Sequence, residues 1–225
     1  SREACNLYYD QLPDIVAGYM EEIGRLTGRD YKPFNYYGAD DAEYVIVGMG
    51  SMAGCAWETV DYLLKKGEKV GYLDVHLYRP FSAKYFLSQL PETVRKITVG
   101  DRTKEPGAAG EPLYEDVCSV ILESGRAISV YACRYGLASK DFTPAQVIAM
   151  YRNMTEETPK NHYTIGIRDD VTHLSMDYGE EINTVPDGTV SCKFWGLGSD
   201  GTVGANKNTI KIIGDHTGLN VQAYF

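Results

Sequence analysis

The chain has 225 residues, of which 44% are hydrophobic and 24% charged, a balance typical of globular proteins. Its 31 acidic and 22 basic residues give a net charge of -9, which argues against a generic nucleic-acid or anionic-membrane surface. The longest apolar run, 44–50, is far shorter than the roughly 20 residues that span a bilayer, and the N-terminus lacks a signal-peptide pattern. We therefore expect a soluble cytoplasmic protein with one large domain or two modest ones.

The five cysteines and four histidines are scattered along the chain and include no C-x-x-C pair. This spacing lacks the usual signature of a zinc ribbon or of a ferredoxin-type iron–sulfur site. Unpaired cysteines are often buried, and the cytosol keeps them reduced, so we interpret these as free thiols. No metal-binding residue is predicted.

The first predicted element is an amphipathic helix over 14–28. Its apolar side chains recur at helical spacing on one stripe, namely Ile15, Tyr19, Ile23 and Leu26. A polar turn at 36–43 then leads into the apolar run 44–50. A run that is hydrophobic on both faces is expected of a central parallel strand covered by helices.

Helices and strands alternate through the next hundred residues. Further strands are predicted at 69–78, 94–99 and 127–137, and helices at 51–67, 82–90, 113–124 and 143–154. Short connections between alternating strands and helices predict an α/β fold, an open and mostly parallel sheet with helices on both faces. This domain, with its N-terminal helix, is expected to occupy residues 1–155.

The composition changes after this domain. Residues 156–188 are polar and rich in turn formers, which predicts a linker. A strand at 189–197, a helix after the glycine-rich turn and a strand at 220–225 would form a β-α-β unit. So short a unit buries little core alone, so 189–225 is interpreted as the truncated start of a further domain, and mobility is expected there.

Residues 48–53 match the dinucleotide fingerprint G-x-G-x-x-A, between a predicted strand and a predicted helix. Glycines there would let a pyrophosphate approach the helix, and Asp74, near the end of the next strand, would hold a ribose. This favours a Rossmann-like, NAD-binding dehydrogenase domain. The alternative is that small residues at a strand-to-helix turn simply allow tight packing. The sequence Tyr78-Arg79-Pro80-Phe81 after the second strand counts against the dinucleotide site.

Two longer motifs carry a family resemblance. They are DRTKEPGAAGEPLY at 101–114 and GLGSDGTVGANK at 196–207. With them the chain resembles an internal fragment of pyruvate:ferredoxin (flavodoxin) oxidoreductases. The order of the GMGS turn, the helix ending in KKGEKVGYLDV and the RPF segment is similar to the transketolase C-terminal domain, which the resemblance implies for 1–155.

The loop at 101–114 offers a charged cluster of Arg102, Lys104 and Glu105. Its glycines and prolines are typical of an irregular loop of fixed shape. The cluster could contact a partner domain or an anionic substrate. Equally, the loop could be a rigid connection whose charges are solvated.

The second glycine-rich turn again joins a predicted strand to a predicted helix. Backbone N–H groups at such a helix start form an anion-binding concavity, and Lys207 and Lys211 add positive charge. The resemblance implies that 189–225 begins the coenzyme A-binding central domain. The coenzyme A contacts that it implies are Gly198, Ser199, Asp200, Gly201, Thr202 and Val203.

The resemblance further implies that the parent enzyme converts pyruvate and coenzyme A to acetyl-CoA and carbon dioxide and reduces ferredoxin or flavodoxin. It implies a cytoplasmic homodimer of anaerobic metabolism that uses thiamine diphosphate, Mg and [4Fe-4S] clusters. The sequence has no magnesium-binding thiamine motif and no cysteine set for a cluster, so no catalytic residue is predicted. The fragment alone is expected to be inactive and to supply scaffold and part of the coenzyme A site. A non-catalytic structural or interaction module without any ligand is the alternative of another class.

Overall fold

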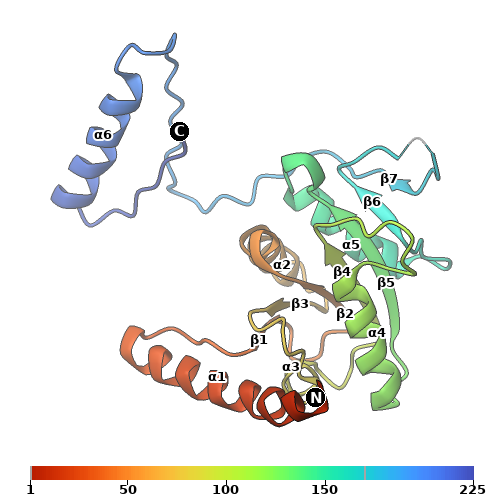
Figure 1. The fold of residues 1–225 in the computed structure, drawn as a ribbon. Coiled ribbons are helices and arrows are strands. Elements are labelled where there is room, and N and C mark those ends of the chain that lie inside the picture. Colours follow the sequence, from red (N-terminus) through yellow and green to blue (C-terminus); the bar gives the residue numbers. More distant parts are fainter. Residues whose placement is uncertain (1, 170) are drawn as a thin grey trace. The chain divides into compact units, whose positions relative to one another are not determined.

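The computed structural model describes residues 2–169 and 171–225, which form two compact units, 1–184 and 185–225 (Figure 1). The first unit contains a seven-stranded sheet and the helices around it. The second contains a single α-helix among its described residues. Each unit is described by itself below.

The elements follow one another in this order. The strands are β1 (Phe34–Gly38), β2 (Tyr44–Gly48), β3 (Val70–Val75), β4 (Lys96–Asp101), β5 (Ser129–Tyr135), β6 (Tyr163–Ile165) and β7 (Ser175–Met176). The α-helices are α1 (Asn6–Thr27), α2 (Ala53–Leu64), α3 (Ala83–Gln89), α4 (Pro112–Ser124), α5 (Pro144–Thr155) and α6 (Thr202–His216). Short 3-10 helices lie at η1 (Arg2–Cys5), η2 (Gly50–Met52) and η3 (Leu137–Ser139).

The sheet has the order β1-β3-β2-β4-β5-β6-β7, and β1 runs antiparallel to β3 while the other pairs are parallel. The predicted α/β class and mostly parallel sheet are confirmed. Because β3 lies on one side of β2 and β4 on the other, the winding of the chain reverses at β2. In doubly wound sheets this reversal makes the carboxyl ends of the two central strands the usual place for a ligand.

Two apolar cores cover the two faces of the sheet. Val45 and Val47 of β2 belong to the core with α3 and α4, whereas Ile46 belongs to the core with α2 and α5. Successive side chains of a strand point to opposite faces, so an uninterrupted apolar run can fill both cores. The apolar run therefore became a central strand, as predicted.

Three differences from the predicted elements lie in the first unit. Helix α1 begins at Asn6 rather than at residue 14 and continues through Pro13, its one buried residue. Strand β1 was not predicted, because it lies largely in the segment before and within the polar turn at 36–43. The predicted linker was wrong over part of its length: β6 and β7 extend the sheet within it. Strands of three and two residues are too short to show a period of two, so only their pairing defines them.

The second unit differs from the predicted β-α-β arrangement. Helix α6 is confirmed, but the strands predicted at 189–197 and 220–225 are absent from the described residues there. The two strands of a lone β-α-β unit could pair only with each other, and an isolated two-stranded pair is marginally stable at best. None of the described residues in 185–225 is buried, which agrees with a unit that lacks its own core.

The central position of β2 gives a direct test of this architecture. Replacing Ile46, which is fully buried, by Ala should lower the free energy of unfolding by roughly 2 to 5 kcal/mol through lost burial and the cavity left behind. Leu122→Ala on α4 is the matched control, because that leucine is 82% exposed and should change stability little. Urea unfolding followed by circular dichroism measures both. Equal losses would contradict the assigned core.

Candidate functional site

The turn before α6 is built from residues with left-handed backbone conformations. Gly198, Ser199 and Gly201 have φ angles of 85°, 49° and 86°. Glycine adopts such angles without penalty, whereas a serine at positive φ is uncommon and needs support from its surroundings. The chain thereby reverses within four residues and enters α6 at Thr202, with Gly201 as the N-cap.

Asp200 closes this turn. Its carboxylate accepts hydrogen bonds from the backbone N–H of Leu197 at 2.8 Å and of Thr202 at 3.0 Å. Hydrogen bonds from the Thr202 side chain and from these two N–H groups lower the pKa of Asp200 to about 2. A Cβ on Gly196 would lie 2.7 Å from the Thr202 hydroxyl, so glycine there leaves room for the closure. The turn is therefore shaped by an ionised carboxylate.

The predicted coenzyme A residues are brought together in this one turn. Five of the six are exposed and Thr202 is half-buried. The first turn of a helix has N–H groups without intrahelical acceptors, and Asp200 takes only that of Thr202. The N–H groups of Val203 and Gly204 therefore remain as donors at the surface of the turn.

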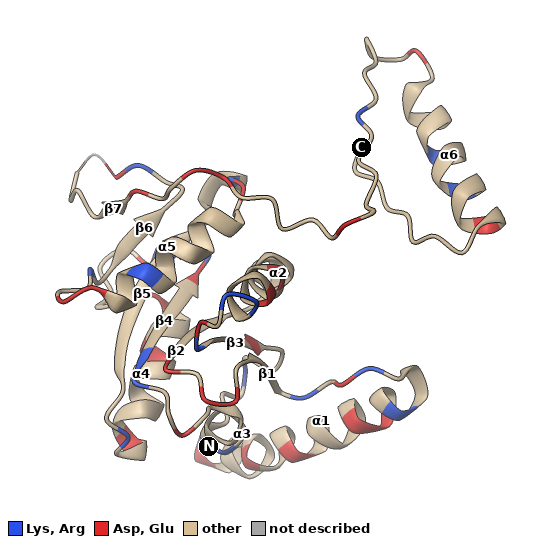
Figure 2. Ribbon diagram, turned by 180° about the vertical axis from the view of Figure 1, so that it is seen from behind, with Lys and Arg blue, Asp and Glu red and all other residues tan. Residues whose placement is uncertain are grey.

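Positive charge lies further along α6, where Figure 2 shows Lys and Arg as blue bands. Lys207 Nζ is 5.6 Å from the centre of the Phe225 ring, a cation–π contact that holds the C-terminus near the helix. The turn itself carries the Asp200 carboxylate, which disfavours a phosphate directly on it. The arrangement suits a ligand with neutral amides at the turn and an anionic group near the lysines.

The first glycine-rich turn, at 48–53, has a packing role. A Cβ on Gly48 would lie 2.5 Å from the Met52 sulfur, and one on Gly100 would overlap the Met52 methyl group. Met52 is fully buried against the carboxyl ends of β2 and β4. It fills the position that a dinucleotide would approach. This favours the interpretation that the small residues at 48–53 allow tight packing. Sequence reasoning did not identify Met52, although glycines at the ends of two neighbouring strands were a usable signal.

Asp74 is committed to contacts inside the protein. It is 3% exposed, its Oδ2 lies 3.1 Å from His76 Nε2, and the Tyr72 hydroxyl donates to its Oδ1 at 3.4 Å. The hydrogen bond to Asp74 raises the pKa of His76 above its ordinary value. A buried carboxylate with these partners is not placed to hold a ribose, which counts against the dehydrogenase interpretation.

The loop at 101–114 is fixed at its start by Asp101. The buried carboxylate accepts the N–H groups of Leu113 at 3.2 Å and Tyr114 at 3.1 Å, at the N-terminus of α4. Arg102 donates to the Gly136 carbonyl at 3.0 Å and to the Ser51 hydroxyl at 2.7 Å. These contacts join the carboxyl ends of β2, β4 and β5. Asp101 and Arg102, the first two residues of the loop, therefore hold these strand ends together.

Glu111 fixes the other end of the loop. Its Oε1 lies 3.4 Å from Arg134 Nη1 and 3.6 Å from Lys104 Nζ, while its Oε2 is buried without a hydrogen-bond partner. Arg134 also donates to the His162 carbonyl at 3.0 Å. Between these anchors the loop residues 104–109 are exposed. Arg134 was missed from the sequence, where the signal was an arginine inside a predicted apolar strand.

Within the described ranges 2–169 and 171–225, no group of three His, Cys, Asp or Glu residues is placed to hold a metal ion. No described helix is both long and apolar enough to cross a membrane.

The middle of the chain matches a known family model. A family model described as pyruvate:ferredoxin oxidoreductase core domain II matches residues 42–147. These residues run from the start of β2 into α5 and include the Met52 turn and the loop at 101–114. They exclude α1 and α6.

Three relatives extend the match to nearly the whole chain. Pyruvate:ferredoxin oxidoreductase of Moorella thermoacetica is 59% identical over 100% of this chain and 19% of its own length. Pyruvate-flavodoxin oxidoreductase of Enterobacter agglomerans is 52% identical, again over 100% and 19%. Pyruvate dehydrogenase [NADP(+)] of Euglena gracilis is 49% identical over 99% and 12%. The chain thus spans about a fifth or less of the length of these relatives.

The buried carboxyl group of Asp101 makes the free energy of unfolding depend on pH. Burial raises the pKa of Asp101 to about 6, above a value near 3.8 when unfolded, so the folded state holds this proton more tightly. The stabilising contribution is complete below about pH 4 and is lost as the pH rises through 6, up to roughly 3 kcal/mol. Relative to Asp101→Asn, the wild type should therefore lose stability between pH 4 and 7. Urea unfolding across this range measures the difference, and parallel curves would refute the assignment.

Proposed function

Since this chain corresponds over its whole length to a segment of the pyruvate:ferredoxin and pyruvate-flavodoxin oxidoreductases, we propose that it is part of such an enzyme. The parent would oxidatively decarboxylate pyruvate with coenzyme A to acetyl-CoA and carbon dioxide. The observation that carries the proposal is 59% identity to the Moorella thermoacetica enzyme along the entire chain. The match of the middle segment to the core-domain family model supports it.

The electron acceptors named for the relatives narrow the role of the segment. Proteins named for ferredoxin, flavodoxin and NADP(+) share it at 49–59% identity. A segment that selected the acceptor would be expected to differ among them. We assign the segment to the oxidation of pyruvate, the substrate that their names have in common, and ferredoxin or flavodoxin to contacts elsewhere in the parent.

The two units would serve this half-reaction differently. The sheet unit is a scaffold, because Met52, Arg102 and Arg134 fill and join the edge where a ligand would otherwise bind. The turn at 198–203 would contribute to the coenzyme A site as the beginning of a further domain. Its exposed N–H donors suit the amides of the pantetheine arm, and Lys207 and Lys211 would lie toward the phosphates.

Thiamine diphosphate, Mg and [4Fe-4S] clusters would be held by other parts of the parent, as the family resemblance implies. These groups would supply the decarboxylation and electron transfer when bound there. A cytoplasmic homodimer acting in anaerobic metabolism is proposed from the family resemblance alone.

The isolated chain should have no oxidoreductase activity. Pyruvate-dependent reduction of methyl viologen, with coenzyme A added, should remain at the buffer rate for the 225-residue chain and should be rapid for the full-length protein under the same conditions. The physical reason is the missing set of electron-transfer ligands. Viologen reduction by the purified chain would contradict the assigned role.

The coenzyme A turn can be tested with a matched pair of glycines. Gly201 and Gly188 both have a φ of 86° with open space where a Cβ would lie, so alanine strains both backbones alike. In the full-length protein, Gly201→Ala should weaken coenzyme A binding at least tenfold in isothermal titration, whereas Gly188→Ala should leave the Kd unchanged. The isolated chain should bind more weakly, because it carries only part of the site.

NAD(H) is titrated beside coenzyme A as the competing ligand. Saturable NAD(H) binding that weakens on Asp74→Ala would favour the dehydrogenase interpretation instead. If the two glycine variants changed the Kd of coenzyme A equally, the turn at 198–203 would not be part of the coenzyme A site. The family assignment would be unaffected.

A further inference from the structure

Helix α1 presents its apolar stripe to solvent. The stripe recurs every three or four residues and comprises Tyr8, Leu12, Ile15, Tyr19, Ile23 and Leu26. Tyr8, Tyr19 and Leu26 are 77%, 64% and 81% exposed. Only Pro13 of the helix is buried. An amphipathic helix normally turns such a stripe toward the core of its own domain, whereas the stripe of α1 points to solvent.

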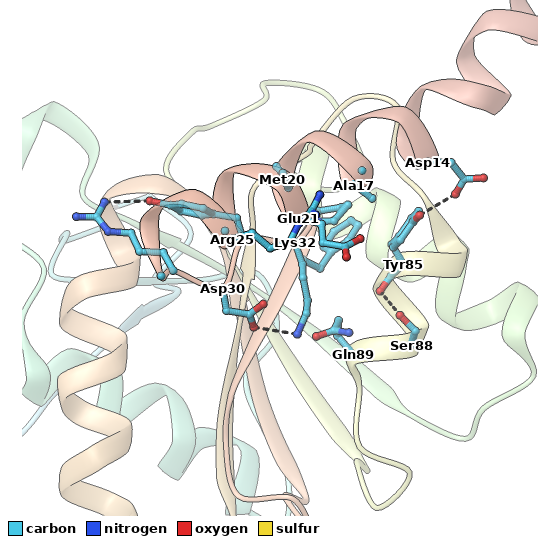
Figure 3. Close-up of a pocket in the computed structure, with 17 residues that line it drawn as sticks. Asp14, Ala17, Met20, Glu21, Arg25, Asp30, Lys32, Tyr85, Ser88 and Gln89 are labelled. Atoms are coloured by element: carbon cyan, nitrogen blue, oxygen red, sulfur yellow. Dashed lines mark hydrogen bonds and ion pairs between the residues drawn. The ribbon is translucent and has the colours of Figure 1, made fainter.

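The opposite side of α1 faces its own unit, with Pro13 buried and Ala17, Met20 and Gly24 half-buried. Ala17, Glu21 and Gly24 line a hollow of about 840 Å³ whose other walls are the segment 28–34 and α3 (Figure 3). A Cβ on Gly24 would lie 2.6 Å from the Arg29 carbonyl oxygen, so this side is fitted to the following turn.

The contacts that hold α1 to α3 are polar and exposed. Asp14 accepts hydrogen bonds from Lys84 Nζ at 2.8 Å and from the Tyr85 hydroxyl at 2.7 Å. Surface ion pairs of this kind contribute little to stability, and Pro13 is the one residue of the helix that is fully buried. Polar contacts therefore orient α1 with its stripe outward but do not cover the stripe.

We propose that the outer stripe of α1 is a docking surface for another domain of the same, longer polypeptide. This rests on the proposed function, because it needs the parent to be several times longer than this chain. A contiguous apolar stripe in which five of six large side chains are exposed marks an interaction site rather than a free surface. The occupant would present an apolar groove that accepts aromatic side chains, as helix-in-groove recognition does.

Two observations favour a domain of the parent as the occupant. The core-domain family model begins at residue 42, so α1 lies outside the domain that it matches. Yet α1 lies within the 59% identity to a relative of which this chain is only 19%, so the helix has a place in the longer protein.

The charges of α1 set the chemistry of the occupant. The helix carries four carboxylates, at Asp10, Asp14, Glu21 and Glu22, against the one basic residue Arg25, and Figure 2 shows the acidic residues as red bands along it. Asp14 and Glu21 lie toward the helix's own unit, whereas Asp10 and Glu22 are exposed away from those contacts. The complementary surface is therefore an apolar groove with Lys or Arg at its rim.

Hydrogen exchange tests the proposal without any ligand. The α1 amides should exchange at least tenfold more slowly in the full-length protein than in the 225-residue chain. Tyr19→Asp or Leu26→Asp in the full-length protein should restore the faster exchange. Leu122→Asp is the matched control, since that side chain is 82% exposed on α4 and should leave the α1 rates unchanged. Unchanged protection of β2 and β4 would verify that each variant is folded.

Equal α1 exchange in the chain and in the full-length protein would overturn the proposal. So would a concentration-dependent dimer of the 225-residue chain that Tyr19→Asp dissolves, because the stripe would then belong to a second copy. The exchange rates are independent of coenzyme A titration, so failure of the coenzyme A turn and failure of the docking surface are distinguishable.

Discussion

The arrangement of the sheet unit depends on how closely β2 and β4 approach at their carboxyl ends. Met52 packs over both strand ends on the face of the sheet covered by α2 and α5, and its side chain fits because Gly48 and Gly100 have no side chains of their own. Arg102 then crosses this point to reach Ser51 and the Gly136 carbonyl. The topological switch of the sheet, the usual position of a ligand, is thus filled by the protein's own residues.

The residues that fill this point agree with the scaffold role proposed for the sheet unit. Two buried carboxylates agree with it as well, because Asp101 and Glu111 hold the loop to α4 and to Arg134. The proposed coenzyme A contacts lie instead in the exposed turn before α6. Support and ligand binding are thus proposed for different parts of the chain.

Sequence patterns predicted the central elements because those elements satisfy local rules. The apolar run at 44–50 and the strand–helix alternation after it predict a mostly parallel sheet with this run as an inner strand, and the structure has that arrangement. The patterns failed where tertiary pairing decides. Strands β6 and β7 are defined by their pairing with neighbouring strands, whereas 189–197 pairs with no described strand. For the site, the glycines and Asp200 were visible in the sequence, but the carboxylate's closure of the turn was not.

The far edge of the sheet is β7, a strand of only two residues. Another strand could form very few backbone hydrogen bonds with it, so this edge offers little template for strand addition. The opposite edge is β1, a strand of five residues that pairs only with β3 among the described strands. The two edges therefore differ in how readily a further strand could extend the hydrogen-bonded ladder of the sheet.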